Sequence, residues 1–357
     1  MARNTRPITE ATPTFPRSSL TAVMALAFLV FSALAAPPGA LAQLAKRDFA
    51  VQHLSYFKKQ MGLPLEKKVE RGTPELIDKQ YHTNLDFGVD VRPRRSAKNH
   101  PLEKKVRSML AGLPPEVKKL AGKAVMTVFL VEGDFGTGTT EAVMDDNGEW
   151  KYSYVVLNLS ALDRTANQWG SWKDESAFKP QSGFSIRMTL EPEASDDQEG
   201  ALRFIFLHEL GHVLGQYLGA HGSWEDDTLG EATLNSPYLK ISWKPEGNEM
   251  VSHWKTKYSI LGDLKFYQFA GAPLSIKQAE KAYGQLAKTD FPSLYGATNY
   301  FDDFAESMAI YIHTRVLHKP YLVEVLEDGK VRQTYRSCLQ DGRCENKALE
   351  IQKLLGF

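Results

Sequence analysis

The segment that most constrains the fold is a long apolar stretch with two histidines four positions apart. Residues 201–218 are predicted to form one helix, and residues 202–207 are too apolar for a helix on the surface. His208 and His212 are therefore expected to be buried with it. Buried imidazoles need polar partners, because an unpaired polar group in an apolar interior costs free energy.

The same segment carries two further local signals. Ser195 and Gln198, three residues apart, predict a capping box at the start of the helix. Gly211 and Gly215 each destabilise a helix by about 1 kcal/mol relative to alanine. We therefore expect another element to pack very close to the helix at these glycines.

The histidines belong to the pattern His208-Glu209-Leu210-Gly211-His212, which has the form HExxH. Residues at i and i+4 lie on one face of a helix, so both imidazoles can reach a single zinc ion. Glu209 is then placed beside the open coordination position of the metal, where a general base is needed. The sequence predicts one Zn²⁺ held by His208 and His212, with Glu209 as the base.

A third ligand is needed, and several residues are candidates. The pattern HExxHxxGxxH is excluded because Leu218 stands at its last position. Glu231 lies nineteen residues after His212, a spacing used by aminopeptidase-type enzymes. Asp302 and Glu306 lie at i and i+4 behind a predicted helix cap at Asn299.

Residues 295–306 read Tyr-Gly-Ala-Thr-Asn-Tyr-Phe-Asp-Asp-Phe-Ala-Glu. This order resembles the second active-site segment of gluzincin zinc metallopeptidases of the anthrax lethal factor type. The resemblance implies that Tyr295 assists catalysis, Asp302 is the third zinc ligand, and Glu306 is an outer carboxylate bonded to a zinc-binding histidine.

This sequence departs from the family in two ways. It has Asp302 where the family has Glu, and the long separation from His212 implies an insertion. Because aspartate is one methylene shorter, its helix must approach the metal more closely. Glu306 and Glu231 remain alternative ligands.

The fold class expected is α+β, with a zincin-like arrangement. Apolar runs at 125–131 and 152–159 predict buried strands, and residues 184–190 predict an edge strand that could pair with an extended peptide. Asp146-Asn147-Gly148 predicts a hairpin with a type I′ turn, and Asp328-Gly329 predicts a second hairpin. The expected architecture is a small twisted sheet with its edge strand over the HExxH helix, followed by a helical second half.

The N-terminus predicts export. An uncharged apolar run at 20–36 precedes Ala40-Leu41-Ala42, which has the small-x-small form of a cleavage site, so residues 1–42 are predicted to be a signal peptide. The run is shorter than the roughly 20 residues of a membrane-spanning helix, and no stable span is expected after cleavage. A periplasmic or extracellular location follows, and there Cys338 and Cys344 are expected to form a local disulfide.

Four regions follow: the signal peptide, an N-terminal helical extension at 43–120, a catalytic domain at 121–337, and a C-terminal tail at 338–357. The chain has 43 Lys and Arg against 43 Asp and Glu, so no charge excess favours nucleic acid as a partner. The sequence predicts an exported zinc-dependent peptidase that acts on a protein or peptide. The alternative is a non-catalytic zincin-fold protein that binds a protein or a cell-envelope partner.

Overall fold

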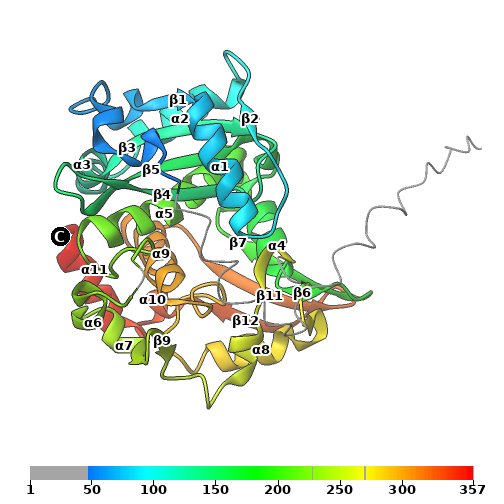
Figure 1. The fold of residues 1–357 in the computed structure, drawn as a ribbon. Helices are drawn as coiled ribbons and strands as arrows, with labels where there is room; N and C mark the ends of the chain where they lie inside the picture. The colour runs from blue at the N-terminus through cyan, green and yellow to red at the C-terminus, as the bar shows by residue number, and fades with distance from the viewer. Residues whose placement is uncertain (1–46, 227, 269–270, 357) are drawn as a thin grey trace, which may run out of the picture. The chain divides into compact units, whose positions relative to one another are not determined.

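The structure is a computed structural model that describes residues 47–226, 228–268 and 271–356. The predicted signal peptide at 1–42 lies outside the described residues. Phe49–Phe357 form one compact unit of mixed α+β structure. Figure 1 shows the arrangement of its helices and strands.

The main sheet has the strand order β1-β3-β5-β4. Strands β1 (Val69–Arg71), β3 (Val125–Glu132) and β5 (Trp150–Asn158) are parallel, and β4 (Gly138–Met144) runs antiparallel to β5 at the edge. The short strand β2 (Arg94–Arg95) pairs with the end of β3. The predicted strands at 125–131 and 152–159 are therefore both present, and they lie side by side.

Both faces of this sheet are covered. Successive side chains of a strand point to opposite faces, so the residues of β3 divide between two core clusters. Val128 and Leu130 of β3 belong to the large core cluster, which includes helix α5. Phe129 and Val131 belong to a second cluster on the other face, with residues of α1 (Pro74–Asp86). This alternation explains why β3 is buried almost throughout.

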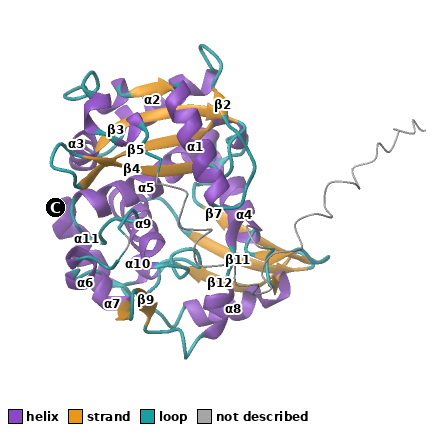
Figure 2. Cartoon of the chain, viewed as in Figure 1, coloured by secondary structure: helices purple, strands orange, loops and turns teal. Residues whose placement is uncertain are grey.

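Helix α5 (Gln198–Tyr217) carries the HExxH segment and lies between the main sheet and helix α9 (Tyr300–Tyr311). Figure 2 shows the strands of the main sheet on one side of α5 and the helical second half on the other. The cap of α5 differs from the prediction: Asp197, not Ser195, accepts the hydrogen bond from Gly200 N–H. Ser195 instead ends a short 3₁₀ turn before the helix.

A second, three-stranded sheet has the order β12-β11-β7. Strand β7 (Phe184–Thr189) is at its edge, as predicted for 184–190, but it packs against α4 (Ala166–Glu175). Helix α5 packs against β4 and β5 instead. The edge strand beside the HExxH helix is therefore β4, and the expectation that residues 184–190 supply it was wrong.

Both predicted hairpins are present. Strands β11 (Leu322–Glu327) and β12 (Lys330–Arg336) pair across Asp328-Gly329, and both turn residues have positive φ. Strands β4 and β5 pair across residues 145–149. Of that turn only Gly148 has positive φ, so it is not the predicted type I′ turn.

The remaining helices and strands complete the two halves of the unit. They are α2 (Pro101–Ala111), α3 (Pro115–Ala124), β6 (Phe178–Lys179), α6 (Glu231–Asn235), α7 (Leu239–Ser242), β8 (Trp243–Glu246), β9 (Glu249–Ser252), β10 (Leu274–Ser275), α8 (Ala279–Leu286), α10 (Cys338–Asp341) and α11 (Glu345–Leu355). Cys338 and Cys344 form the predicted disulfide, which joins the starts of α10 and α11.

The region before residue 121 is not a separate extension in the described structure. Strand β1 hydrogen-bonds into the main sheet, and α1 covers one face of it. Residues 49–120 therefore belong to the same unit as the rest, and no boundary is seen at residue 120. Leu76 and Ile77 of α1 belong to the core cluster that also contains residues of β3 and β5.

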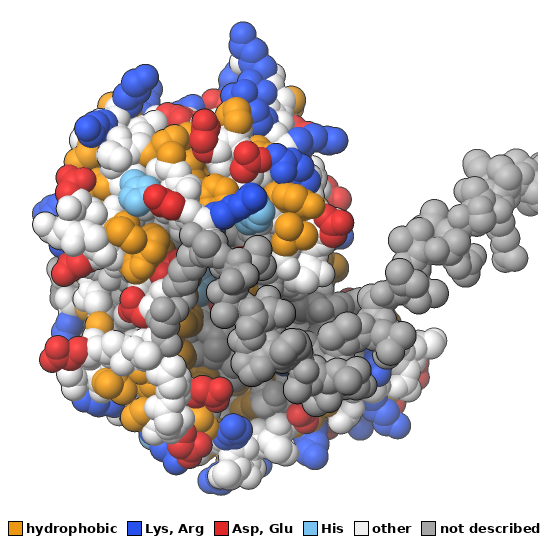
Figure 3. Space-filling view, in the orientation of Figure 1, with side chains coloured by type: hydrophobic (Ala, Val, Ile, Leu, Met, Phe, Trp, Pro, Cys, Tyr) orange, Lys and Arg blue, Asp and Glu red, His pale blue; other side chains and the backbone are white. Residues whose placement is uncertain are grey.

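The equal numbers of acidic and basic residues are reflected on the surface of the protein. The face seen in Figure 3 shows acidic and basic side chains interspersed over its described parts. In the part of the chain that the structure describes, no helix is both long enough and apolar enough to cross a bilayer.

Candidate metal centre

Three side chains from two helices converge at one point. The Nε2 atoms of His208 and His212 lie 3.2 Å apart, and Asp302 Oδ1 lies 3.6 Å and 3.4 Å from them, respectively. Zinc bound tetrahedrally at about 2.0–2.1 Å would keep its ligand atoms about 3.3 Å apart. The donor types and their separations therefore fit one Zn²⁺. Among the histidines, cysteines and carboxylates of the described residues, His208, His212 and Asp302 lie close enough together to share one metal ion.

The start of α9 explains how Asp302 is aimed. Asn299 caps the helix as predicted, and its Oδ1 accepts hydrogen bonds from the N–H groups of Phe301 and Asp302. The Asn299 amide and the Thr298 hydroxyl also donate to Asp302 Oδ2, at 2.6 Å and 3.3 Å. One carboxylate oxygen is thus held by the cap, and the other faces the imidazoles.

Close packing of the two helices lets an aspartate reach this point. A Cβ atom added to Gly211 would lie 2.5 Å from the Cα of Ala305, so the backbones are in contact. A glutamate would be longer than Asp302 by one carbon–carbon bond, about 1.5 Å. The close approach expected at Gly211 is therefore present, and it offsets the shorter side chain.

The space beside Gly215 is also occupied closely, but by a side chain and not by the backbone of another helix. A Cβ atom there would lie 2.0 Å from Nε2 of His221, a fully buried histidine. Burial lowers the pKa of His221 to about 3, so its ring is neutral. His221 packs edge-on against the ring of Phe304 from α9. This contact ties the end of α5 to the helix that carries Asp302.

Glu306 lies behind the cluster rather than in it. Its Oε1 atom is 3.0 Å from Nδ1 of His208, the ring nitrogen that faces away from Asp302. Burial by itself raises the pKa of Glu306, but the Lys173 ammonium and the hydrogen bonds with His208 and Ser293 outweigh it and lower the pKa to about 2. An ionised Glu306 accepts the Nδ1–H of His208 and leaves Nε2 free to bind a metal.

Glu209 extends toward the edge strand β4. Its Oε2 accepts a hydrogen bond of 2.7 Å from the Thr140 hydroxyl. Gly138 provides room for it, because a Cβ atom at that position would lie 2.8 Å from Glu209 Oε1. The carboxylate is thereby fixed in the cleft beside the histidines.

Tyr295 packs directly over one of the histidines. Its ring stacks on the ring of His208, with centroids 5.4 Å apart. Burial and the nearby Asp302 carboxylate raise the pKa of the Tyr295 hydroxyl well above its usual value. The phenol is therefore protonated and can donate a hydrogen bond.

These residues line an open cleft of about 900 Å³. Its walls include β4 and helix α1, and Glu141 of β4 joins the two. Its carboxylate accepts hydrogen bonds from Lys79 and Thr83 of α1, at 2.7 Å and 2.9 Å. Residues before position 121 therefore shape the cleft directly.

Glu231 is not brought to this centre. It is an exposed residue at the start of α6 and is neither in the metal-binding group nor in the lining of the cleft. The nineteen-residue spacing alone could not exclude it. The chain after Gly219 stays in contact with α5 through His221 and Trp224, and Glu231 follows only at the start of α6.

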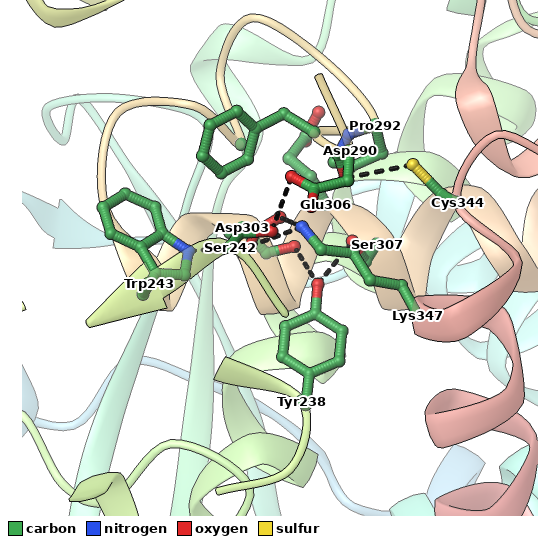
Figure 4. Close-up of polar contacts among 12 residues, drawn as sticks. Tyr238, Ser242, Trp243, Asp290, Pro292, Asp303, Glu306, Ser307, Cys344 and Lys347 are labelled. Atoms are coloured by element: carbon green, nitrogen blue, oxygen red, sulfur yellow. Dashed lines mark hydrogen bonds and ion pairs between the residues drawn. The ribbon is translucent and has the colours of Figure 1, made fainter. Parts of the chain in front are cut away.

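A buried polar network holds α9 at Asp303, the residue next to Asp302, as Figure 4 shows. Both carboxylate oxygens of Asp303 accept hydrogen bonds from Lys347 of α11, at 2.6 Å and 2.7 Å. The Trp243 indole donates to the same carboxylate, and the Tyr238 hydroxyl donates to its backbone carbonyl or to Ser307. Asp303 thus anchors the helix turn from which Asp302 projects.

Four residues of this site were not found from the sequence. Thr140 and Gly138 lie in β4, whose Gly and Thr residues gave a weaker strand signal than 184–190 did. Lys173 and Ser293, which contact Glu306, lie far from both motifs, and no sequence signal marks them.

Comparison with known proteins identifies no relative. No protein-family profile, no curated protein and no solved structure matches the chain. The interpretation of this centre therefore depends on the geometry and chemistry of its own residues.

Proposed function

We propose that this protein is a zinc-dependent peptidase in which His208, His212 and Asp302 hold one Zn²⁺. The observation that carries the proposal is the convergence of three ligand atoms within 3.2–3.6 Å of one another. Three protein ligands leave one position of a tetrahedral zinc for water, as in catalytic rather than structural zinc sites.

A zinc ion in this place would polarise a peptide carbonyl and lower the pKa of a bound water. Glu209 would act as the general base that takes a proton from the attacking water and passes it to the leaving amine. The Tyr295 hydroxyl donates a hydrogen bond to the oxygen on which negative charge develops. Glu306 holds the tautomer of His208.

The edge of strand β4 in the cleft favours an extended peptide as substrate. Over its described length β4 pairs with β5 on one side, and on the other makes a single bridge from Met144 to His53. The remaining edge, beside Glu209, presents backbone groups that an extended chain can pair with.

Export is part of the proposal. The disulfide between Cys338 and Cys344 supports it, because such bonds persist in oxidising compartments. N-terminal sequencing of the protein from its native cell should begin at Gln43 or within a few residues. A mature protein that retains Met1 would contradict export without affecting the zinc centre.

The test is a digest of an unbiased peptide library by the purified protein, with and without a chelator. The parent should hold one zinc and cleave peptides. Glu209→Gln should keep zinc and lose cleavage, because it removes the base but no ligand. Glu231→Gln is the matched control and should cleave as the parent does.

Two outcomes would contradict the proposal. Cleavage by Glu209→Gln at the parent rate would exclude Glu209 as the base. Zinc binding without cleavage of any library peptide would favour the non-catalytic alternative, in which the protein binds a protein or cell-envelope partner.

A further inference from the structure

Lys173 is a buried lysine on α4, with a side chain only 1% exposed. Its Nζ atom lies 3.3 Å from Glu306 Oε2 and 3.7 Å from Asp174 Oδ1. A buried ammonium carries a desolvation cost, and ion pairing often does no more than offset it. The position of this charge therefore calls for an explanation other than stability.

The two oxygens of Glu306 connect Lys173 to the metal centre. Oε2 faces Lys173 and also accepts a hydrogen bond of 2.6 Å from Ser293, while Oε1 faces His208 Nδ1 at 3.0 Å. Glu306 itself is completely buried. Without a cation beside it, this carboxylate would be a buried unpaired charge or a neutral acid, and neither would orient His208 as well.

Lys173 also contacts the predicted catalytic tyrosine. Its Nζ atom lies 4.9 Å from the centroid of the Tyr295 ring, within the range of a cation–π contact. Ser293 also links Glu306 to the Tyr295 segment. Its hydroxyl donates to Glu306 and accepts the N–H of Gly296, the residue after Tyr295, at 2.9 Å. The orientation of Tyr295 and that of Glu306 thus depend on the same ammonium.

We infer that Lys173 is a positioning residue that holds Glu306 and the Tyr295 ring in place, and thereby sets the zinc affinity of His208. This inference rests on the proposed zinc site. Lys173 touches no ligand atom and takes no part in the reaction. It acts through Glu306 on the metal and through the Tyr295 ring on turnover.

Another buried lysine provides a matched control. Lys68 is as deeply buried, but it donates to the backbone carbonyls of Gly122 and Val125, away from the cleft. Lys68→Met and Lys173→Met remove the same charge from similarly buried positions. A purely structural role would give both variants the same pattern: altered stability with unchanged zinc affinity.

The experiment measures zinc dissociation constants by competition with a chromophoric chelator for the full mature chain. Lys173→Met should bind zinc about 10–100-fold more weakly than the parent, as expected for loss of support behind a zinc-binding histidine. Lys68→Met should leave the dissociation constant unchanged. Lys173→Arg, which keeps the charge, should fall between Lys173→Met and the parent.

A double-mutant cycle with Glu306→Gln shows whether the effect passes through Glu306. The double variant Lys173→Met/Glu306→Gln removes both charges of this ion pair, so Glu306 is not left as an unpaired carboxylate and the variant also serves if Lys173→Met alone does not fold. Its loss of zinc affinity should be smaller than the product of the two single losses, because both changes remove one interaction.

Three results would overturn the inference. A parent-like zinc affinity in Lys173→Met refutes it while the zinc site stands. Losses that multiply independently in the double variant refute the route through Glu306. A parent protein that binds no zinc refutes the proposed function, and the inference with it.

Discussion

Gly211 of α5 and Ala305 of α9 contact each other backbone to backbone: a Cβ atom added to Gly211 would lie 2.8 Å from the carbonyl oxygen of Ala305. Ala305 lies between Asp302 and Glu306 on α9. The separation of the two helices at this point therefore determines whether an aspartate at position 302 reaches the histidines of α5.

Gly211→Ala should push α9 away from α5 and weaken zinc binding. Inserting a methyl group into such a contact costs typically about 1–3 kcal/mol of stability. Asp302→Glu in the Gly211→Ala background should recover part of the zinc affinity, because the longer side chain spans the wider gap. Zinc titration and thermal unfolding of the single and double variants measure both effects.

Gly122→Ala is the control for this pair. Gly122 lies in α3 and has no neighbour within 4 Å of an added Cβ. The change should stabilise the helix by up to about 1 kcal/mol and leave zinc binding unchanged. A Gly211→Ala variant that behaves in the same way would show that the helix separation does not limit zinc binding by Asp302.

Substitution of the three competing carboxylates should give three different results. Asp302→Ala should abolish zinc retention, Glu306→Ala should weaken zinc or activity by about 10–100-fold, and Glu231→Ala should change neither. Metal content and peptide cleavage are the measurements. Full zinc occupancy in Asp302→Ala together with loss in Glu231→Ala would replace this ligand set with the aminopeptidase-type spacing.

Tyr295→Phe should separate binding from turnover. The variant keeps the ring that stacks on His208, so zinc should stay in place, but it loses the hydroxyl that we propose donates a hydrogen bond to the oxyanion. Loss of one such donor typically lowers kcat by about 10²–10³-fold. The expected result is a lower kcat with an unchanged zinc dissociation constant, and a parent-like kcat would remove Tyr295 from the mechanism.

The disulfide should stabilise the C-terminal end of the unit. Cys338 and Cys344 are six positions apart, and closing so short a loop is worth about 2 kcal/mol. A Cys338→Ala/Cys344→Ala variant should unfold at lower denaturant concentration than the oxidised parent. A reducing agent should lower the unfolding midpoint of the parent but not that of the variant. An equal response of both proteins to reduction would contradict a stabilising role.

His313 predicts a pH dependence of folding. Its ring is fully buried, with Nε2 2.9 Å from the Leu190 carbonyl oxygen, and burial lowers its pKa to about 4. In the unfolded chain its pKa is near 6.5. As the pH falls from 6.5 to 4, the unfolded chain binds a proton that the folded chain does not, so the free energy of unfolding decreases.

The loss over this pH range should be at most about 3 kcal/mol. It is measured by denaturant unfolding between pH 7 and 4. His313→Gln has no group that titrates in this range, so the part of the slope due to His313 should disappear. An identical slope in the variant would mean that the buried histidine does not contribute.

Local sequence was enough to predict the parts of this protein that depend on neighbours along the chain. The spacing of His208 and His212 places both on one face of α5, and Asn299 caps α9 as the pattern indicated, because both depend on helix geometry within a single turn. The turn at Asp328-Gly329 and the Cys338–Cys344 pair were predictable for the same reason: their partners are close in sequence.

Only the tertiary structure decided which distant residues meet. It brings Asp302 rather than Glu231 to the histidines, places β4 rather than residues 184–190 beside Glu209, and adds β1 to an edge of the main sheet. It also places Lys173 behind Glu306, a contact across 133 positions of sequence. These contacts depend on how buried faces pack against one another. Gly211 predicted a close approach to its helix, but nothing in the sequence identified Ala305 of α9 as the segment that makes it.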